Sequence, residues 1–451
     1  MDSTGPVTDR ERMSDQGGFM RRHLRSVLCV PLALLAVVVA PTAASAADPV
    51  MEWNLIAQGQ TIPLRPTAHG ETRGMAMVAG AMYDAVNAID RGHQPYLVDP
   101  GAIDAQPWFS QDAAAVTAAH DVLVALAPAE QPTLDAQYAT TMAGIDDAFK
   151  AEGAAVGAAA AQAMLDFRRD DGFLAPFDFS LVIGPAAGDW RPVTPTALDP
   201  DAWVGNEQPF LIESPSQFRS KGPNSLTSRA YTKDFDEVKE VGAIDSTSRT
   251  ADETAAAVFW QFPPIALWNG VARTLADRYD LGAADQARLY AMINLAAADG
   301  AISCWNDKWY WHFWRPRAAI READTDGNPA TIADPTWESL FAAATQTSPP
   351  LGTPPFPDHP SGHGCVSGAT LHAFRDFFGK DKVEFDVVGG RTLDGVLVAP
   401  RHFDRFSRAL DEIIDARVWG GIHFRTADEQ GALIGKKVAN WMDKHYFHRV
   451  R

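Results

Sequence analysis

The stretch "ETRGMAMVAGAMYDAVNAID" (residues 71–90) indicates the fold class of this sequence. Its apolar residues recur at spacings of three and four, which places them on one face of an α-helix: Met75, Val78, Met82, Val86 and Ile89. Similar helical patterns return along the chain at residues 112–128, 134–169, 229–241, 249–261, 265–279 and 284–300. Alternating runs typical of strands are scarce, and only "KVEFDVV" (382–388) and "GVLVAP" (395–400) are compatible with one short hairpin. The sequence therefore predicts an all-α fold built as helical bundles.

Residues 21–46 have the composition of an export signal. Arginines at 21, 22 and 25 precede an apolar run (27–40), which the small residues Ala44-Ser45-Ala46 follow. We predict a signal peptide at residues 1–46, and hence a secreted or extracytoplasmic protein without a stable membrane anchor after cleavage. An uncleaved anchor is disfavoured because the apolar run is short and a cleavage site follows it. The paired arginines leave the twin-arginine route and the ordinary secretory route both open.

The remaining chain divides by composition into three regions. The 451 residues are 46% hydrophobic and 21% charged, which is an ordinary globular composition. We predict a helical region at 47–172 and a C-terminal helical bundle at 229–451. Residues 173–228 are rich in proline and glycine and show no sustained period. An irregular stretch of this length is typical of a functional loop or a covering layer, and its aromatic residues favour a layer that packs on the helices.

The net charge argues against some classes of partner. The chain carries −18, and removal of the five arginines and four acids of residues 1–46 leaves −19. Nucleic acids and anionic membranes recruit basic surfaces, so neither is expected as a partner. Cys304 and Cys365 remain after cleavage; export permits a disulfide, but the sequence leaves their pairing open. Assembly into a homo-oligomer is also left open.

Three cations fall where the pattern predicts a buried face. The segment "CWNDKWYWHFWRPR" (304–317) is apolar on almost every side, which indicates a buried helix, and Lys308 and Arg315 are spaced to share one face of it. In "FDRFSRALDEIIDARVWGGIHFR" (403–425), Arg417 continues an apolar stripe, and His423 follows a Gly-Gly pair expected to end the helix. Unpaired buried cations are costly, so a negative group is expected beside them. Ordinary buried ion pairs are the alternative.

The stretch "HPSGHG" (359–364) has the pattern of an anion-binding helix start. Pro360 fixes a turn, Ser361 suits an N-cap, Gly362 lets a ligand approach the backbone, and His363 falls in the first helical turn. Free N–H groups and the helix dipole favour an anion at such an end. A plain helix cap with a surface histidine is the alternative. Zinc is disfavoured, because Pro360 and Gly362 break the helical spacing of the two histidines and no third ligand is evident.

Taken together, these residues describe a buried oxyanion site, and their order resembles a known family. K-x6-R-P, P-S-G-H and R-x5-H resemble the signature of the superfamily of vanadium-dependent haloperoxidases and type 2 phosphatidic acid phosphatases. The matching residues are Lys308, Arg315, Pro316, Pro360, Ser361, Gly362, His363, Arg417, Gly421 and His423. "AMVAGAMYDAVNAI" and the "WRP…PF" loop are also similar to secreted bacterial haloperoxidase-like proteins. The resemblance implies two four-helix bundles.

The resemblance also implies a role for each motif residue. Lys308, Arg315 and Arg417 would neutralise the oxygens of vanadate or phosphate, while Ser361 and the Gly362 N–H would add hydrogen bonds. His363 would be the acid–base group. His423 would be the axial ligand of vanadium, or the nucleophile that is phosphorylated in a phosphatase. In a peroxidase Lys308 would also polarise bound peroxide.

Three functions are consistent with this site. Trp305 and Phe356 resemble the apolar halide pocket of chloroperoxidase-type members, and His359 stands where soluble acid phosphatases more often carry tyrosine. These features favour a vanadate-dependent haloperoxidase acting on hydrogen peroxide, a halide and a small organic substrate. The alternatives are an acid phosphatase with a phosphohistidine intermediate on His423 and a non-catalytic oxyanion-binding protein. Packing within the bundle is the alternative account of both aromatics.

The chain departs from the family pattern behind the last histidine. Members usually carry an acid four residues after it, which orients the imidazole ring. Here Ala427 stands at that place and Asp428 follows. Either Asp428 reaches His423 through a shifted turn or the ring is less well supported, which typically lowers metal affinity or activity about 10–100-fold.

Overall fold

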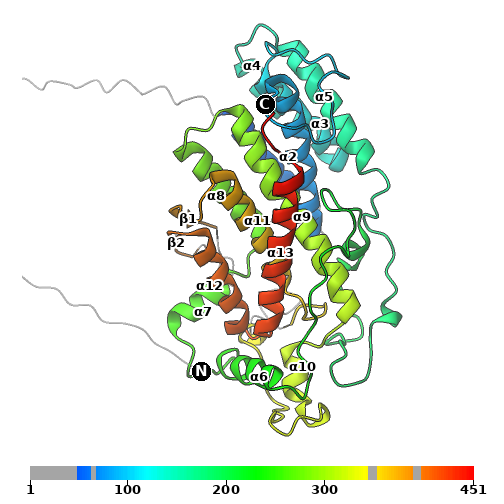
Figure 1. The fold of residues 1–451 in the computed structure, drawn as a ribbon, viewed down its shortest axis with the longest axis vertical. Helices are drawn as coiled ribbons and strands as arrows, with labels where there is room; N and C mark the ends of the chain where they lie inside the picture. Colours follow the sequence, from blue (N-terminus) through cyan, green and yellow to red (C-terminus); the bar gives the residue numbers. More distant parts are fainter. Residues whose placement is uncertain (1–47, 62–67, 344–352, 390–397, 451) are drawn as a thin grey trace, which may run out of the picture. The chain divides into compact units, whose positions relative to one another are not determined.

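The computed structural model describes residues 48–61, 68–343, 353–389 and 398–450. Across these residues the chain forms thirteen α-helices, several short 3₁₀ turns and one two-stranded sheet (Figure 1). The predicted all-α fold is therefore confirmed. The predicted signal peptide (1–46) lies outside the described residues.

The N-terminal helices pack closely against one another. They are α1 (Pro49–Thr61), α2 (Ala68–Asp90), α3 (Gln111–Leu126), α4 (Gln131–Gly144) and α5 (Lys150–Phe167), with a 3₁₀ turn η2 at Pro128–Glu130. A Cβ atom at Gly157 would stand 2.3 Å from the Ala114 carbonyl oxygen, so α5 approaches α3 at a distance only glycine permits. The sequence predicts one helical stretch at 134–169. The structure has two helices there, α4 and α5. The Lys150 ammonium caps the end of α4 by donating to the carbonyls of Met142 and Ile145.

Residues 173–228 are irregular, as predicted, with only the 3₁₀ turns η3 (Phe179–Leu181) and η4 (Ala202–Asn206). One buried carboxylate fastens part of this segment to the helices. Asp299 on α9 (Ala283–Trp311) accepts hydrogen bonds of 2.7–2.8 Å from three successive backbone N–H groups, those of Phe210, Leu211 and Ile212. The segment is thus held against a helix that also carries site residues.

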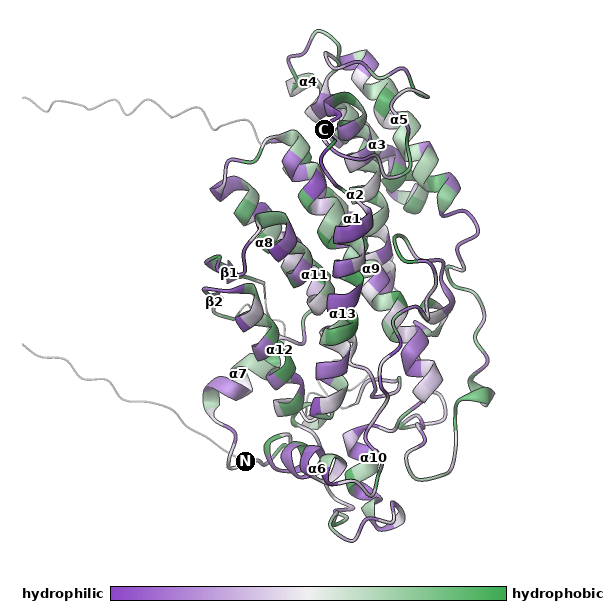
Figure 2. Ribbon diagram, in the orientation of Figure 1, coloured by the Kyte–Doolittle hydropathy of each residue, from purple (hydrophilic) through white to green (hydrophobic). Residues whose placement is uncertain are grey.

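The C-terminal helices surround the candidate site. They are α6 (Arg229–Val241), α7 (Ala251–Phe259), α8 (Pro264–Arg278), α9 (Ala283–Trp311), α10 (Pro316–Arg321), α11 (Gly362–Phe378), α12 (Phe406–Trp419) and α13 (Arg425–His445), with 3₁₀ turns η5 (Ala323–Thr325) and η6 (Leu340–Ala343). The 29-residue α9 packs on α2 on one side and on α11 and α13 on the other, so two groups of helices share it (Figure 1). Hydrophilic and hydrophobic bands alternate along α12 and α13 in Figure 2, as expected for amphipathic helices.

Two local predictions need correction. Strand β1 (Phe385–Val387) lies in the predicted run, but its antiparallel partner is β2 (Arg401–Phe403), which begins just after "GVLVAP". Lys308 and Arg315 do not share a helical face, because α9 ends at Trp311 and His312 takes a left-handed conformation with φ of 33°. Arg315 instead precedes the first residue of α10.

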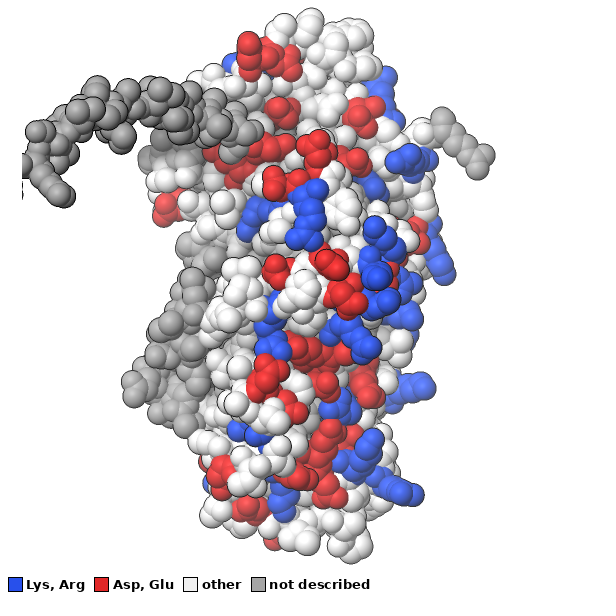
Figure 3. Space-filling view, turned by 90° about the vertical axis from the view of Figure 1, so that its left-hand side faces the viewer, with Lys and Arg blue, Asp and Glu red and all other residues white. Residues whose placement is uncertain are grey.

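All described residues belong to one compact unit, and the three-region division of 47–451 remains a prediction. On the face drawn in Figure 3, acidic and basic side chains are interspersed, and neither sign dominates. Within the described ranges, no single helix combines the length and apolar character needed to cross a membrane. The bent pair Gln111–Leu126 and Pro128–Gly144 meets those conditions only when taken together.

Candidate active site

The start of α11 forms one wall of the site. Ser361 is the N-cap, and its hydroxyl accepts from the backbone N–H of Gly364 at 3.4 Å, while its own N–H donates to the Ala427 carbonyl at 2.9 Å. Gly362 opens the helix, as predicted, and a Cβ atom there would stand 2.9 Å from the Trp305 ring. The helix N-terminus can therefore approach both Trp305 and a bound anion closely.

The two site arginines are buried and keep N–H groups without partners. The Arg315 guanidinium donates to the carbonyls of Phe356 (2.8 Å) and Ile422 (2.7 Å), and Arg417 donates to the carbonyl of Trp260 (2.9 Å). Among the described atoms, neither Nη2 of Arg315 nor Nε of Arg417 has a hydrogen-bond partner. Burial lowers the pKa of each guanidinium to about 10, so both remain charged at neutral pH.

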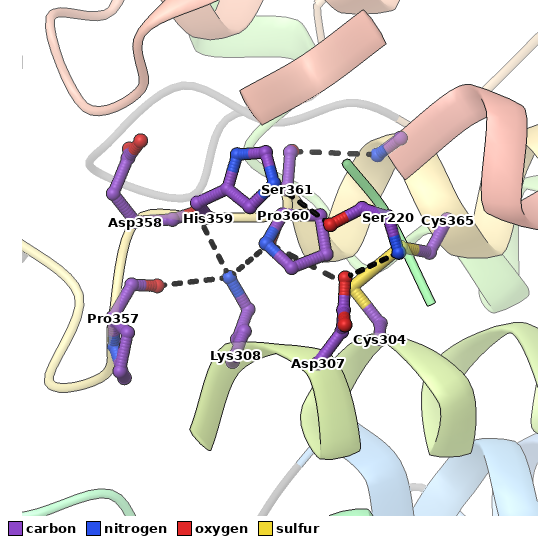
Figure 4. The surroundings of a disulfide bond; sticks show 11 residues. Ser220, Cys304, Asp307, Lys308, Pro357, Asp358, His359, Pro360, Ser361 and Cys365 are labelled. Carbon is purple, nitrogen blue, oxygen red and sulfur yellow. Dashed lines mark hydrogen bonds between the residues drawn. A yellow bond between two sulfur atoms is a disulfide. The ribbon is translucent and has the colours of Figure 1, made fainter. Parts of the chain in front are cut away.

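Lys308 clamps the loop that precedes α11. Its fully buried ammonium donates to the carbonyls of Pro357 (2.9 Å), Asp358 (3.1 Å) and Pro360 (Figure 4). Burial, reinforced by Arg315, lowers the pKa of Lys308 well below its usual range. A direct bond from Lys308 to an oxyanion would therefore replace one of these three loop contacts.

His423 lies between a carboxylate and a guanidinium. Its Nδ1 is 2.9 Å from Oδ1 of Asp358, and its Nε2 is 3.2 Å from Nη1 of Arg315. Burial lowers the pKa of His423 well below 6.5, and Arg315 and Lys308 lower it further. The partner of the ring is thus Asp358, which the sequence analysis did not single out. The only sign of Asp358 in the sequence was its place directly before His359, as the one acid in "PPFPDHPSGHG".

Asp428 does not take the role considered for it. It is fully buried at the start of α13, but its carboxyl oxygens make no described hydrogen bond to His423. Burial raises the pKa of Asp428 well above its ordinary value, and the nearby Ser361 and Arg417 oppose this rise. Asp428 therefore contributes to the electrostatics around Arg417 rather than to the orientation of His423.

His363 faces the same region from the first turn of α11. Its Nε2 is buried and has no hydrogen-bond partner in the described part of the chain. Burial lowers the pKa of His363 well below 6.5, and the charge of Arg417 adds to the effect. The imidazole is therefore neutral near pH 7 and has a nitrogen free to exchange a proton with a ligand.

A cavity of about 280 Å³ brings most of the predicted residues together. Trp305, Phe356, Gly362, His363, Arg417 and His423 line it, and the Trp305 and Phe356 rings pack with centroids 5.1 Å apart. Lys308, Arg315 and Ser361 do not line this cavity, but each contacts a residue or loop that does.

Two further residues shape the apolar side of the cavity, and no local motif marked them. His69 of α2 lies edge-on to Trp305, with ring centroids 3.9 Å apart. Asp199 of the irregular segment accepts a 2.8 Å hydrogen bond from the Trp305 indole N–H. The N-terminal region and the segment 173–228 thus both support Trp305.

A disulfide joins the two helices that carry the site. Cys304 on α9 pairs with Cys365 on α11, with their Cα atoms 6.1 Å apart (Figure 4). Cys304 is one helical turn before Lys308, and Cys365 is two residues after His363. This pairing, which the sequence left open, fixes the separation of the Lys308 loop clamp and the α11 N-terminus.

Comparison with known proteins identifies the relatives of this chain. Residues 288–451 match a family model described as the VCPO second helical-bundle domain. Vanadium chloroperoxidase of Curvularia inaequalis is 26% identical over 304 residues, which cover 52% of this chain and 49% of that protein. The chain is thus similar to the vanadium haloperoxidases in its C-terminal helical bundle. It nevertheless spans about half the length of that curated relative.

Solved structures of bacterial haloperoxidases share the fold. The first bacterial vanadium-dependent iodoperoxidase has a TM-score of 0.71 at 23% identity, covering 89% of this chain and 98% of its own. A holo-type bacterial vanadium-dependent chloroperoxidase has a TM-score of 0.63 at 18% identity, covering 90% and 93%. These likenesses show a haloperoxidase fold that extends over most of the chain.

The cavity and the cations around it fit a tetrahedral oxyanion. Three buried polar atoms without described partners are Nη2 of Arg315, Nε of Arg417 and Nε2 of His363. Two of these atoms are cationic donors, and the α11 N-terminus adds backbone N–H groups on the same side. Charge-assisted hydrogen bonds of this kind suit vanadate and phosphate equally well.

Proposed function

We propose that this protein is a vanadate-dependent haloperoxidase that uses hydrogen peroxide to oxidise a halide to hypohalous acid. The observation that carries the proposal is the composition of the cavity. An apolar wall of Trp305 and Phe356 faces the same space as Arg417, His363 and His423. A halide needs a desolvated place beside the oxyanion, whereas a phosphate monoester would need polar contacts for its leaving group.

The chain's own residues would hold vanadate as follows. Arg315 and Arg417 would neutralise its charge, the Ser361 hydroxyl and the Gly362 N–H would donate hydrogen bonds to its oxygens, and Nε2 of His423 would bind the vanadium. Bound vanadate would supply a Lewis-acid centre that activates peroxide toward attack by a halide. Lys308 would hold the loop before α11, and a rearranged Lys308 would also reach the peroxide.

His363 would act as the general base and general acid of the reaction. Because its imidazole is neutral and its Nε2 is free, it can accept a proton from hydrogen peroxide as the peroxide binds. It can return that proton to the oxygen that leaves as hypohalous acid, while solvent supplies the further proton with which the second peroxide oxygen leaves as water. The apolar wall would limit the entry of water and leave the halide poorly solvated, which increases its nucleophilicity.

The proposal includes the cellular setting and the remaining partners. Residues 1–46 would direct the protein out of the cytoplasm, where it would meet peroxide, a halide and a small organic acceptor. The acidic chain would not use nucleic acid as a partner. The acceptor would be halogenated by the hypohalous acid formed at the site.

The test is bromide-dependent halogenation of a phenolic dye by the purified mature protein with peroxide, before and after orthovanadate is added. We expect activity to appear with vanadate and to fall to background in His423→Ala. His402→Ala is the matched control, because His402 lies outside the site, on β2, and contacts Asp386. Absence of halogenation at saturating vanadate would contradict the proposal. Phosphate release with a phosphohistidine on His423 would then indicate the phosphatase, and binding without turnover a non-catalytic protein.

A further inference from the structure

Two buried aspartates lie near His423, and only one contacts it. We propose that Asp358 is the positioning residue of His423, replacing the acid that the family carries after this histidine, and that it fixes the imidazole with its proton on Nδ1. The inference deepens the proposed function and rests on it for its catalytic meaning. Orientation of the His423 ring, which in the family is usually the task of an acid after this histidine, is thereby assigned to the loop before P-S-G-H.

The hydrogen bonds of His423 define its tautomer. Arg315 Nη1 lies 3.2 Å from Nε2, and a guanidinium can only donate, so Nε2 must be the unprotonated acceptor. A neutral imidazole has one proton, which is then on Nδ1. That nitrogen is 2.9 Å from Oδ1 of Asp358, a carboxylate oxygen that can accept it. Both contacts therefore require the same tautomer.

Asp358 is held firmly enough to serve as an anchor. Its side chain is 1% exposed, its N–H donates to the Phe313 carbonyl at 2.9 Å, and its own carbonyl accepts from Lys308. Lys308 also holds the carbonyls of Pro357 and Pro360, so the backbone on both sides of Asp358 is fixed. In Figure 4 the Asp358 carboxyl group points away from Lys308. Its Oδ1 contacts Nδ1 of His423 instead.

The position of Asp428 explains why its carboxyl group does not replace Asp358 as the hydrogen-bond partner of His423. The Ser361 N–H donates to the Ala427 carbonyl, which fastens the start of α13 to the N-cap of α11. From there the Asp428 carboxyl group lies near Ser361 and Arg417, and its oxygens make no hydrogen bond to a described nitrogen of His423. One extra residue between the histidine and the acid thus moves the carboxyl group out of reach.

The consequence is that Nε2 stays unprotonated, so its lone pair, which accepts from Arg315 in this structure, can be given to the vanadium of vanadate. If Asp358 were replaced by asparagine, the amide N–H could donate to Nδ1 and favour the opposite tautomer, with its proton on Nε2. That proton would block the ligand position. We expect Asp358→Asn to lower vanadate affinity about 10–100-fold, the usual effect of removing the group behind a metal-binding histidine.

The first experiment needs neither vanadate nor activity. Nitrogen NMR of protein labelled with ¹⁵N-histidine, with the His423 signals assigned by comparison with His423→Gln, reports which ring nitrogen carries the proton. We expect a protonated Nδ1 and an unprotonated Nε2 in the wild-type protein. A proton on Nε2 in the ligand-free protein would overturn the inference, whether or not any variant folds.

The second experiment compares the two aspartates in the full mature chain. Vanadate binding to Asp358→Asn and Asp428→Asn is measured by calorimetry, after circular dichroism confirms native helix content. We expect the tenfold or greater loss only in Asp358→Asn, together with a changed histidine tautomer. The same loss in Asp428→Asn alone, with the tautomer of Asp358→Asn unchanged, would overturn the inference. A wild-type protein with the expected tautomer but no halogenation would contradict only the proposed function.

Discussion

Two clusters of buried cations in this protein differ in how their charge is balanced. In the paired cluster, Arg73 and Arg168 contact Asp171 and Glu207 at 2.6–3.1 Å. In the site cluster, which is Lys308, Arg315 and Arg417, no described carboxylate lies within ion-pair distance. The site cations donate to backbone carbonyls instead, and two of their N–H groups have no partner in the part of the chain that the structure describes.

The difference separates a structural cluster from a binding cluster. Removing a cation from water costs several kcal/mol unless an opposite charge is placed beside it. The paired cluster meets this cost within the chain, so it stabilises the fold at all times. The site cluster meets it only in part, through carbonyl dipoles, and an oxyanion ligand would complete the balance. The same residue type thus serves stability in one cluster and recognition in the other.

The largest expected effect is on the paired cluster. Arg168→Ala should lower the free energy of unfolding by about 3–5 kcal/mol, because it leaves Asp171 and Glu207 buried with one cation instead of two. It also removes the contact of the guanidinium with the Phe210 ring, 3.8 Å from the ring centroid. Urea denaturation followed by circular dichroism measures the change.

The control for this prediction is Arg169→Ala, since Arg169 is an exposed neighbour in an ion pair with Asp166. Exposed pairs contribute about 0–1 kcal/mol, so this variant should unfold close to the wild-type midpoint. If Arg168→Ala were as stable as Arg169→Ala, the paired cluster would not be structural and the comparison would fail.

The next effect concerns the covalent link beside the site cluster. The disulfide Cys304–Cys365 closes a span of 61 residues and holds α9 against α11. Its removal in Cys304→Ala/Cys365→Ala should lower the free energy of unfolding by about 2–4 kcal/mol. Vanadate affinity at a temperature well below the unfolding transition should fall as well, because the Lys308 clamp and the α11 N-terminus are no longer tied.

A loss of stability with unchanged affinity would show that the bundle alone positions the site. Reduction of the wild-type protein under mild denaturant, followed by the same titration, is the matched measurement. Thermal unfolding and calorimetry report the two quantities separately, so a general loss of structure is distinguishable from a loosened site.

The third prediction is the opposite of the first: removal of a buried arginine should lower ligand affinity and not stability. Arg417→Met keeps much of the side-chain volume but removes a buried charge that has no ion-pair partner among the described residues, although the nearby Asp428 attracts it. The free energy of unfolding should stay the same or rise, since a desolvated charge is removed. Oxyanion affinity should fall by about 1.5–3 kcal/mol, or about 10–150-fold, because a charge-assisted hydrogen bond is lost. Calorimetry with orthovanadate measures it, and unchanged affinity would place Arg417 outside the binding cluster.

The sequence indicated the site cluster because its positions break a local pattern. Arg417 interrupts an apolar stripe, and Lys308 stands in an almost wholly apolar segment; both are buried, on α12 and α9. The helix start at Ser361 followed from turn and cap chemistry, which is local. What a single segment determines was therefore predictable, including the helices at 71–90 and 229–241.

The contacts between segments were not predictable in this way. The partner of His423 is Asp358, 65 residues earlier, because three carbonyls bound by Lys308 set the path of that loop. Likewise, Arg315 faces the site because the left-handed turn at His312 redirects the chain. Sequence spacing alone placed Lys308 and Arg315 on one helical face, which was wrong.

The effect that is smallest at neutral pH, and that grows only as the pH falls, tests the low-dielectric wall of the site cluster through His69. Burial, with a contribution from Lys308, lowers the pKa of His69 from 6.5 to about 3. Between these two values the unfolded chain binds a proton that the folded protein does not. The stability of the ligand-free wild type should therefore fall, relative to His69→Gln, as the pH drops from about 6.5 to about 3. The slope of the difference approaches about 1.4 kcal/mol per pH unit.

His120 supplies a control of the opposite sign. Burial alone would lower its pKa, but hydrogen bonds to Asp121 and Asp135 outweigh burial and raise it. The folded protein then binds the proton more tightly, so the contribution of His120 is present below pH 6.5 and is lost as the pH rises through the folded pKa. Denaturation of His69→Gln below pH 6.5, and of His120→Gln from pH 6.5 upward, should give stability differences from the wild type whose slopes have opposite sign. A flat difference for His69→Gln between pH 6.5 and about 3 would mean that water reaches His69, and the apolar wall beside Trp305 could not desolvate a halide.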